Sequence, residues 1–167
     1  GTEKDGFDAK NITVNTNSKY EGYDIRTTLI RRTSDSDLDG GSGDDLDYTA
    51  ESDMNLYQLS SKIDNSKGFT NFTFSRTEYD REYVNGTEID TYDSTSNTYI
   101  LTNTLLKSNF DITPGIEYEY FDGSFNNTGS YTAKVDTDGE NVGYFVNGNL
   151  IASDKLLVSA GIRQDDP

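Results

Sequence analysis

The chain has no cysteine and no histidine among its 167 residues. Without cysteine it cannot form disulfides, thiolate nucleophiles or zinc–thiolate sites, and its redox compartment stays undecided. Without histidine it lacks the usual imidazole general base and the commonest metal ligand. The side chains that most often carry nucleophilic catalysis and zinc binding are therefore missing.

Apolar residues are also scarce. They make up 32% of the chain, which has no tryptophan and only 2 prolines. A water-soluble protein of this length usually needs more of them to offset the entropy of ordering the chain. However, 12 tyrosines, 8 phenylalanines and recurrent β-branched residues exceed what disordered chains contain. The composition therefore predicts a folded chain with fewer apolar residues than a compact core prefers.

Long hydrophobic runs are absent as well. No apolar run approaches the roughly 18 residues of a transmembrane helix, whereas a transmembrane strand needs only about 10 alternating residues. The chain opens on Gly1 and shows no signal peptide, which predicts a processed or excised piece of a longer protein.

Positive charge is in short supply, because 30 acidic residues outnumber 14 basic ones and give a net charge of -16. This balance argues against nucleic acid as a partner, since phosphates attract Lys and Arg. It also fits poorly with binding an anionic membrane through basic patches, and it suits the capture of cations.

Alternation of apolar and polar residues recurs along the whole chain, and helical periodicity with caps does not. The clearest case places Leu156, Val158, Ala160 and Ile162 on one face of a strand. The sequence therefore predicts an all-β, antiparallel up-and-down meander of about eight strands, near 7–16, 24–33, 55–63, 69–79, 97–106, 112–121, 141–152 and 155–163.

The predicted connections alternate between short and long. Short turns fall at 17–23, 64–68, 107–109 and 153–154, and long polar loops fall at 34–53, 80–96 and 122–140. Barrels of the outer membrane have short periplasmic turns and longer extracellular loops. Tyrosines and phenylalanines near both strand ends resemble the two aromatic girdles of such barrels. The pattern favours part of a larger transmembrane β-barrel over a soluble, Tyr-rich sheet.

The segment 34–53 carries eight acidic residues and no basic one. Asp35, Asp37, Asp39 and Gly40 match the opening half of an EF-hand loop, but Leu46 stands where the loop's final Glu belongs. Neither flank is helical, which argues against a true EF-hand. Two interpretations stay open: a calcium site of another geometry, and a solvated acidic loop without metal.

Catalytic motifs are missing. There is no nucleophile elbow, phosphate-binding glycine loop or zinc motif. Glu117 and Glu119 share one strand face and could imitate a carboxylate pair, but polar residues facing a barrel lumen explain them more simply. We do not expect an enzyme.

Several short motifs resemble the TonB-dependent receptors for vitamin B12 (cobalamin). They are the Asp5-Gly6-Phe7 entry to a strand, Arg32-Thr33 before the acidic loop, and a late hairpin from Asn141 that ends in Arg163-Gln164-Asp165-Asp166. The resemblance covers nearly the whole chain, as the middle of a barrel. No plug domain, TonB box or C-terminal barrel strand is present in it.

This resemblance implies a segment of a barrel of about 22 strands in the outer membrane of a Gram-negative bacterium, embedded in the lipid bilayer. The receptor would bind and transport cobalamin, or a related large nutrient, with energy passed from TonB through the plug. It would bind Ca²⁺ on its outer loops. By position, Glu3 and Asp5 match the first acidic pair, Asp35 or Asp37 the next and Asp47 (or Asp45) the last, with Asp39 in the same loop.

Two alternatives remain. One is a secreted, soluble calcium-binding β-sandwich or adhesion module, in which the apolar rows pack against each other about 10 Å apart. The other is a piece of a passive, porin-like barrel without a plug or a specific ligand.

Overall fold

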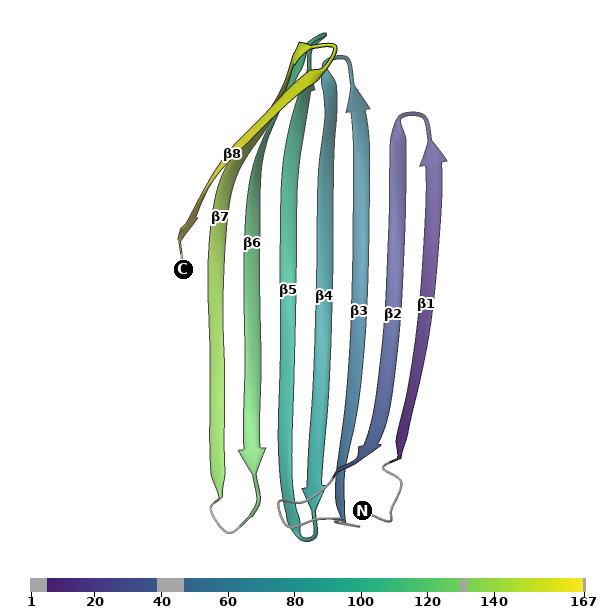
Figure 1. Cartoon of the computed structure of the whole chain (residues 1–167), viewed down its shortest axis with the longest axis vertical. Coiled ribbons are helices and arrows are strands. Elements are labelled where there is room, and N and C mark those ends of the chain that lie inside the picture. The colour runs from purple at the N-terminus through teal and green to yellow at the C-terminus, as the bar shows by residue number, and fades with distance from the viewer. Residues whose placement is uncertain (1–5, 39–46, 130–131, 167) are drawn as a thin grey trace.

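The computed structural model describes residues 6–38, 47–129 and 132–166, and these form one antiparallel sheet (Figure 1). Each strand pairs with the next in the chain, so the order in the sheet is the order in the sequence. The eight strands are β1 (Phe7–Tyr20), β2 (Tyr23–Asp37), β3 (Tyr48–Asn65), β4 (Gly68–Asn85), β5 (Glu88–Leu106), β6 (Phe110–Asn127), β7 (Ala133–Ser153) and β8 (Leu156–Asp166). Within these residues, no helix is long and apolar enough to cross a membrane.

The predicted up-and-down meander is confirmed, and each strand overlaps a predicted one. The strands are longer than expected, mostly at one end. The predicted long loop at 80–96 is wrong, because β4 and β5 pair up to Asn85 and Glu88 and leave a two-residue turn. The predicted loop at 122–140 is also wrong, since β6 and β7 pair up to Asn127 and Ala133. The predicted loop at 34–53 is shorter too, since β2 reaches Asp37 and β3 starts at Tyr48.

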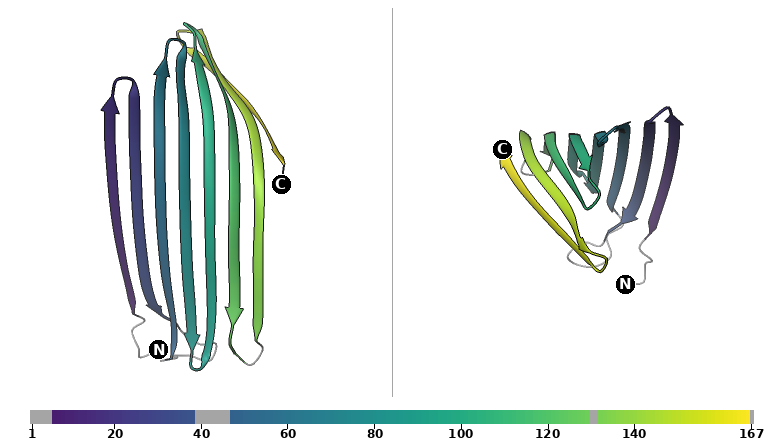
Figure 2. Two further views of the ribbon diagram at one scale, coloured as in Figure 1. Left: turned by 180° about the vertical axis from the view of Figure 1, so that it is seen from behind. Right: turned by 90° about the horizontal axis from the view of Figure 1, so that it is seen from above.

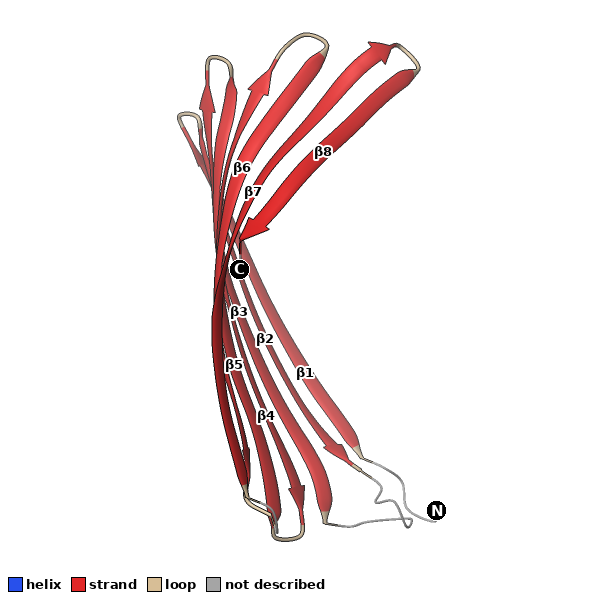
Figure 3. Cartoon of the chain, turned by 90° about the vertical axis from the view of Figure 1, so that its left-hand side faces the viewer, coloured by secondary structure: helices blue, strands red, loops and turns tan. Residues whose placement is uncertain are grey.

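The sheet is a single curved layer. Seen from above, its strands follow an arc from β1 to β8, and the side view shows it bending along the strands (Figures 2 and 3). No second layer covers either face of the described sheet. Among its residues, only Ala50 is a buried apolar side chain and only Thr104 a buried polar one. The described residues therefore form one sheet without a core, and not the two packed sheets of the sandwich alternative.

Side chains alternate between two faces, and residues directly opposite each other on paired strands share a face. We define face A by the row Thr27, Leu59, Phe74, Tyr99 and Tyr118, and face B by the neighbouring row, Thr28, Gln58, Ser75, Thr98 and Glu119. The ring contacts Phe74–Tyr99 (5.0 Å) and Tyr99–Tyr118 (6.2 Å) agree with this assignment of face A.

We also distinguish two halves along the strands. The near half lies toward the turns at 21–22, 66–67 and 107–109, at the top of Figure 1. The far half lies toward the connections at 38–47, 86–87 and 128–132. At the near end, the first turn uses Glu21 and Gly22 with φ of 40° and 88°. Such positive φ values favour a tight two-residue hairpin.

Face A of the near half is apolar. We call its residues the apolar belt: Ile25, Leu29, Tyr57, Leu59, Ile63, Phe72, Phe74, Tyr99, Leu101, Leu105, Ile112, Ile116, Tyr118, Tyr120, Val142, Tyr144, Val146, Leu150, Val158, Ala160 and Ile162. Most of the residues that the sequence predicted to be apolar lie in it, among them Val158, Ala160 and Ile162 of the clearest row. On β6 it runs from Ile112 to Tyr120, the length that a tilted strand needs to cross a bilayer. Face B of the near half is predominantly polar, with many Thr, Ser and Asn residues beside scattered charged and apolar ones.

The polarity of the two faces reverses in the far half. Face A there carries the acidic patch: Asp35, Glu51, Asp53, Glu78, Asp80, Glu82, Asp93, Asp122, Asp136 and Asp138. Face B carries large rings instead. Tyrosines expected near the strand ends, such as Tyr57 and Tyr99, lie mid-strand, because the strands continue beyond them.

Candidate functional site

Three of the residues predicted to bind calcium lie within the described structure. Asp35 and Asp37 belong to β2 and point to face A, and Asp47 lies in the turn before β3. Asp35 is opposite Asp8 on β1 and Glu51 on β3, so three carboxylates share one row. Part of the predicted loop is therefore regular strand, which holds these acids on one face.

Asp37 closes the corner between β1 and β2. Its backbone amide donates to the carbonyl oxygen of Gly6 at 2.9 Å, and its carboxylate accepts from the amide of Gly6 at 3.1 Å. This pair of hydrogen bonds places the start of β1, next to Asp5 in the sequence, beside the end of β2. One of the Asp37 carboxylate oxygens is therefore engaged with backbone.

The other four predicted ligands, Glu3, Asp5, Asp39 and Asp45, lie outside the described residues. Within residues 6–38, 47–129 and 132–166 no group of three or more acidic side chains is arranged to hold a metal ion. The calcium site therefore stays a prediction.

The middle of the acidic patch is a ladder of three aspartates directly opposite one another. Asp53 on β3 is paired with Asp80 on β4, and Asp80 with Asp93 on β5. Partial burial, followed by repulsion from Asp93 and Asp53, raises the pKa of Asp80, which lies beyond the apolar belt. Arg31 reaches Asp53 at 3.7 Å, and the Ser124 hydroxyl donates to Asp93 at 3.3 Å.

Like charges directly across a sheet destabilise it, so this ladder is a strained arrangement at neutral pH. A shallow hollow of about 230 Å³ is lined by six acidic residues together with Ser52, Arg81 and Thr91; the acids are Asp35, Glu51, Asp53, Asp80, Glu82 and Asp93. Protonation or a bound cation would reduce the repulsion.

Directly behind the acidic patch, face B carries a row of rings across four strands. We call Tyr48, Tyr83, Tyr92 and Phe125 the aromatic ladder. Its neighbouring rings have centroids 6.5 Å, 6.0 Å and 4.7 Å apart, and the Tyr83–Tyr92 pair is edge-to-face. These spacings are typical of favourable aromatic pairs.

Arg81 lies in the same area. Its guanidinium carbon is 4.4 Å from the centroid of the Tyr83 ring, within the range of a cation–π contact. The Nε atom of Arg81 is buried and has no hydrogen-bond partner among the described residues. Arg81 and the rings line a hollow of about 370 Å³ together with Tyr79 and Asp90.

Glu117 and Glu119 do not form a catalytic pair. Both point to face B, but each has its own partner: Glu117 forms an ion pair with Arg163 at 2.9 Å, and Glu119 accepts from Ser96 at 3.0 Å.

Sequence reasoning missed both the aspartate ladder and the aromatic ladder, because they fall in stretches interpreted as loops. A signal was available in Glu78–Asn85, where Glu78, Asp80 and Glu82 alternate with Tyr79, Arg81 and Tyr83. Alternation of acids with rings has the same period as alternation of polar with apolar residues. It indicates a strand with one acidic and one aromatic face, in place of the polar and aliphatic faces usual in a soluble sheet.

Comparison with known proteins adds the fold. No protein-family model matches the chain, and no curated protein matches it. A solved structure described as "Copper transporter OprC" is similar, with a TM-score of 0.76 and 12% sequence identity, over 95% of this chain and 28% of that one. Such a low identity is evidence for the fold alone. The chain therefore shares the fold of one segment of that structure, and this segment makes up 28% of its length.

Proposed function

We propose that this chain is a segment of the barrel wall of a TonB-dependent transport receptor in the outer membrane of a Gram-negative bacterium. The observation that carries the proposal is the apolar belt on face A of a curved, single-layered sheet. An uncovered apolar face of this height suits contact with lipid, because the hydrocarbon of a bilayer is about 30 Å thick. The likeness in fold to part of a transporter supports the same reading.

The strands also suit a barrel that projects beyond the membrane. The 19 residues of β5 extend for about 60 Å, which is about twice the bilayer core. With the near half in lipid, the far half stands outside it, where the acidic patch faces water. On the other side, the Thr, Ser and Asn residues of face B line the lumen, as in polar barrel interiors.

The proposed cargo is a nutrient bound from outside. The motif resemblance described above points to cobalamin, whereas the similar structure is named for copper. Within this proposal, energy comes from TonB through a plug domain, and Ca²⁺ orders the outer loops through Glu3, Asp5, Asp35, Asp37, Asp39, Asp45 and Asp47. A porin-like barrel would share the apolar belt but would need neither calcium nor TonB.

Membrane placement is tested on the full-length protein. It should sediment with the outer membrane, require detergent for extraction, and migrate differently on gels before and after boiling. Recovery of a monomeric, cooperatively folding protein in buffer without detergent would contradict the proposal. The excised chain alone should not fold stably in water, because it has two open edges and an apolar face.

Calcium binding is tested by titration calorimetry on the full-length protein in detergent. Wild type should bind Ca²⁺, and the double variant Asp35→Ala/Asp37→Ala should bind it at least about tenfold more weakly. A matched control is Asp64→Ala, whose carboxylate lies at the near end of β3 and pairs with Lys62 at 2.8 Å. Unchanged binding in the double variant would remove this loop from the calcium proposal.

A further inference from the structure

We infer that the far half of face B binds a ring-bearing organic anion, with Arg81 holding the anionic group and the surrounding tyrosines holding the ring. This inference rests on the proposed function, since it names the chemical class of the cargo. It assigns a site in the barrel wall, on Tyr48, Tyr79, Arg81, Tyr83 and Tyr92.

The rings on this face are not part of a core. No second layer covers the described sheet, and Tyr92 remains 40% exposed. In the near half, the same face is predominantly polar, as expected for a wetted lumen, and its rings Phe69 and Phe145 are far apart along the sheet, on β4 and β7. The change to tyrosines in the far half therefore needs a partner other than water. Stacking of a planar group would remove their exposed faces from solvent.

The charges on this face point to an anion. In a chain of net charge -16, Arg32 and Arg81 form no ion pair with any described residue, although neighbouring Arg31 and Arg76 both do. The difference follows from the faces: Arg31 and Arg76 point to face A, where the acids lie, whereas Arg32 and Arg81 point to face B. Among the described residues that line the hollow, the one carboxylate is Asp90, and it accepts a hydrogen bond from the Asn127 amide.

Arg81 is also held in a position to receive a ligand. Its stacking on Tyr83 restricts the guanidinium, while its buried Nε lacks an acceptor. A ligand in the hollow would not reach an atom this buried, but the guanidinium forms no ion pair with any described residue, so an anion would supply the charge partner that it lacks. A carboxylate or sulfonate could accept from the planar guanidinium with two parallel hydrogen bonds.

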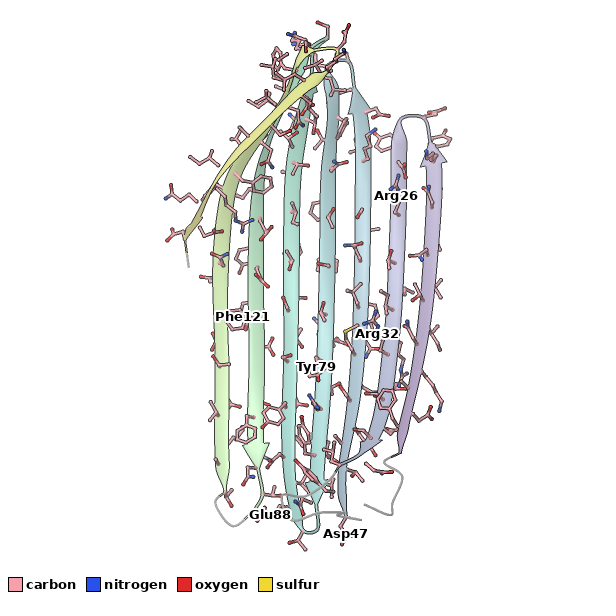
Figure 4. All side chains as sticks on the ribbon, viewed as in Figure 1. Arg26, Arg32, Asp47, Tyr79, Glu88 and Phe121 are labelled. Atoms are coloured by element: carbon pink, nitrogen blue, oxygen red, sulfur yellow. The ribbon has the colours of Figure 1, made fainter. Side chains whose placement is uncertain are left out.

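The space extends across two adjacent hollows. One, of about 370 Å³, is lined by Arg81 and the tyrosines, and the other, of about 310 Å³, is lined in part by Arg32, Ser52 and Met54. Tyr79 lines both. Figure 4 shows Tyr79 and Arg32 in the far half, well away from Arg26 at the near end. A ligand with more than one ring could contact both arginines.

A cationic ligand fits this site less well, although tyrosines often form cages around cations. Arg81 already lies over the Tyr83 ring and would repel a second cation. An aliphatic anion would satisfy Arg81 but would leave the rings exposed. The geometry thus distinguishes ligands by two features, the ring and the sign of the charge.

The experiment uses the full-length protein in detergent and four probes of similar size. They are 1-naphthoate, neutral 1-naphthamide, 1-naphthylmethylammonium and the saturated acid decahydronaphthalene-1-carboxylate, with binding followed by saturation-transfer NMR and competition. We expect 1-naphthoate to bind most tightly. Arg81→Gln should weaken its binding by about tenfold and leave the weaker binding of 1-naphthamide unchanged, whereas Tyr83→Leu should weaken both.

Arg76→Gln is the matched control, because Arg76 lies on the same strand but points to face A and pairs with Glu78 at 2.7 Å. It should bind 1-naphthoate like wild type. Tighter binding of the ammonium probe, equal binding of acid and amide, or an equal loss in Arg76→Gln would overturn the inference. So would the absence of any 1-naphthoate binding. Outer-membrane fractionation of the same preparation reports separately on the proposed function.

Discussion

The near and far halves of this sheet are built from the same eight strands, yet their two faces have opposite characters. In the near half, face A is apolar and face B is polar. In the far half, face A is acidic, and face B carries the aromatic ladder and two arginines that form no ion pair with any described residue. The pairing of β4 with β5 continues through the change without interruption, from Gly68 to Asn85 on β4 and from Glu88 to Leu105 on β5.

This comparison shows that a strand can change its surroundings without changing its backbone. Alternation with period two requires only that successive side chains differ, and it does not determine which face is apolar. In a bilayer the outer face must be apolar, and above it the outer face must be wetted. The reversal at the end of the apolar belt marks the level at which the proposed barrel leaves the lipid.

The largest expected effect comes from placing a charge in the apolar belt. Ile116 lies on face A of β6, between Leu101 and Tyr144 on the adjacent strands. Ile116→Arg should destabilise the full-length protein in lipid vesicles by about 2–4 kcal/mol, the cost of an arginine near the bilayer midplane. Urea unfolding in vesicles measures it.

Thr95→Arg supplies the control for this prediction. Thr95 lies on face A of the adjacent strand but in the far half, opposite Glu78 and Asp122. An arginine there gains acidic neighbours and no lipid contact, so stability should stay within about 0.5 kcal/mol of wild type. Equal losses in both variants would show that the two halves share one environment.

A smaller loss of stability is expected from crowding two side chains of the far half, at Phe121 and Gly139, on face B. Phe121 lies opposite Gly139, and its ring covers the space that a side chain would occupy, since a Cβ at Gly139 would lie 2.7 Å from the ring. Gly139→Ala should therefore cost about 1–3 kcal/mol through overpacking. Phe121→Ala in the same chain should recover most of this loss, which a double-mutant cycle measures.

The matched position in the near half is Gly148, on face A of the same strand. A Cβ there would meet the Asp111 carbonyl oxygen at an ordinary 3.5 Å. Gly148→Ala should be neutral or slightly stabilising, since alanine reduces the freedom of the unfolded chain. A large loss of stability in Gly148→Ala would show that an added methyl group destabilises β7 in general, and not only where it meets the ring of Phe121.

Much of the near half could be predicted from the sequence. The alternation of Leu156, Val158, Ala160 and Ile162, or of Ile116, Tyr118 and Tyr120, identified both the strands and their apolar face. The far half was missed because its strands do not alternate an aliphatic face with a polar one. Asp80 and Tyr83 occur in stretches whose polarity is typical of loops, although the backbone there pairs as regularly as in the near half.

The strand that carries Asp80 could have been recognised from its alternation, but the cross-strand pairing of the three aspartates could not be predicted. Asp53, Asp80 and Asp93 are far apart in the sequence, and they meet only because the hairpins have a particular register. The register of a hairpin is set by its turn. Because 80–96 was predicted to be a long loop, the two-residue turn that includes Gly86, and with it the register of β4 and β5, was not predicted. The calcium prediction depends on residues such as Glu3 and Asp39, which lie outside the described parts of the chain.

The smallest expected effect concerns the pH dependence of the far half. The folded-state pKa of Asp80 is raised, by partial burial and by repulsion from Asp93 and Asp53, so Asp80 destabilises the folded state at neutral pH. This penalty disappears as the pH falls below the ordinary value of 3.8. With EDTA present, Asp80→Asn should stabilise the full-length protein at pH 7 by up to about 1 kcal/mol, and by nothing at pH 3.

Glu78→Gln is the control for this prediction. It lies on the same face but loses its ion pair with Arg76, so it should destabilise the protein at pH 7 instead. If both variants changed the stability at pH 7 in the same direction, burial and repulsion within the aspartate ladder would not distinguish Asp80 from the ion-paired Glu78.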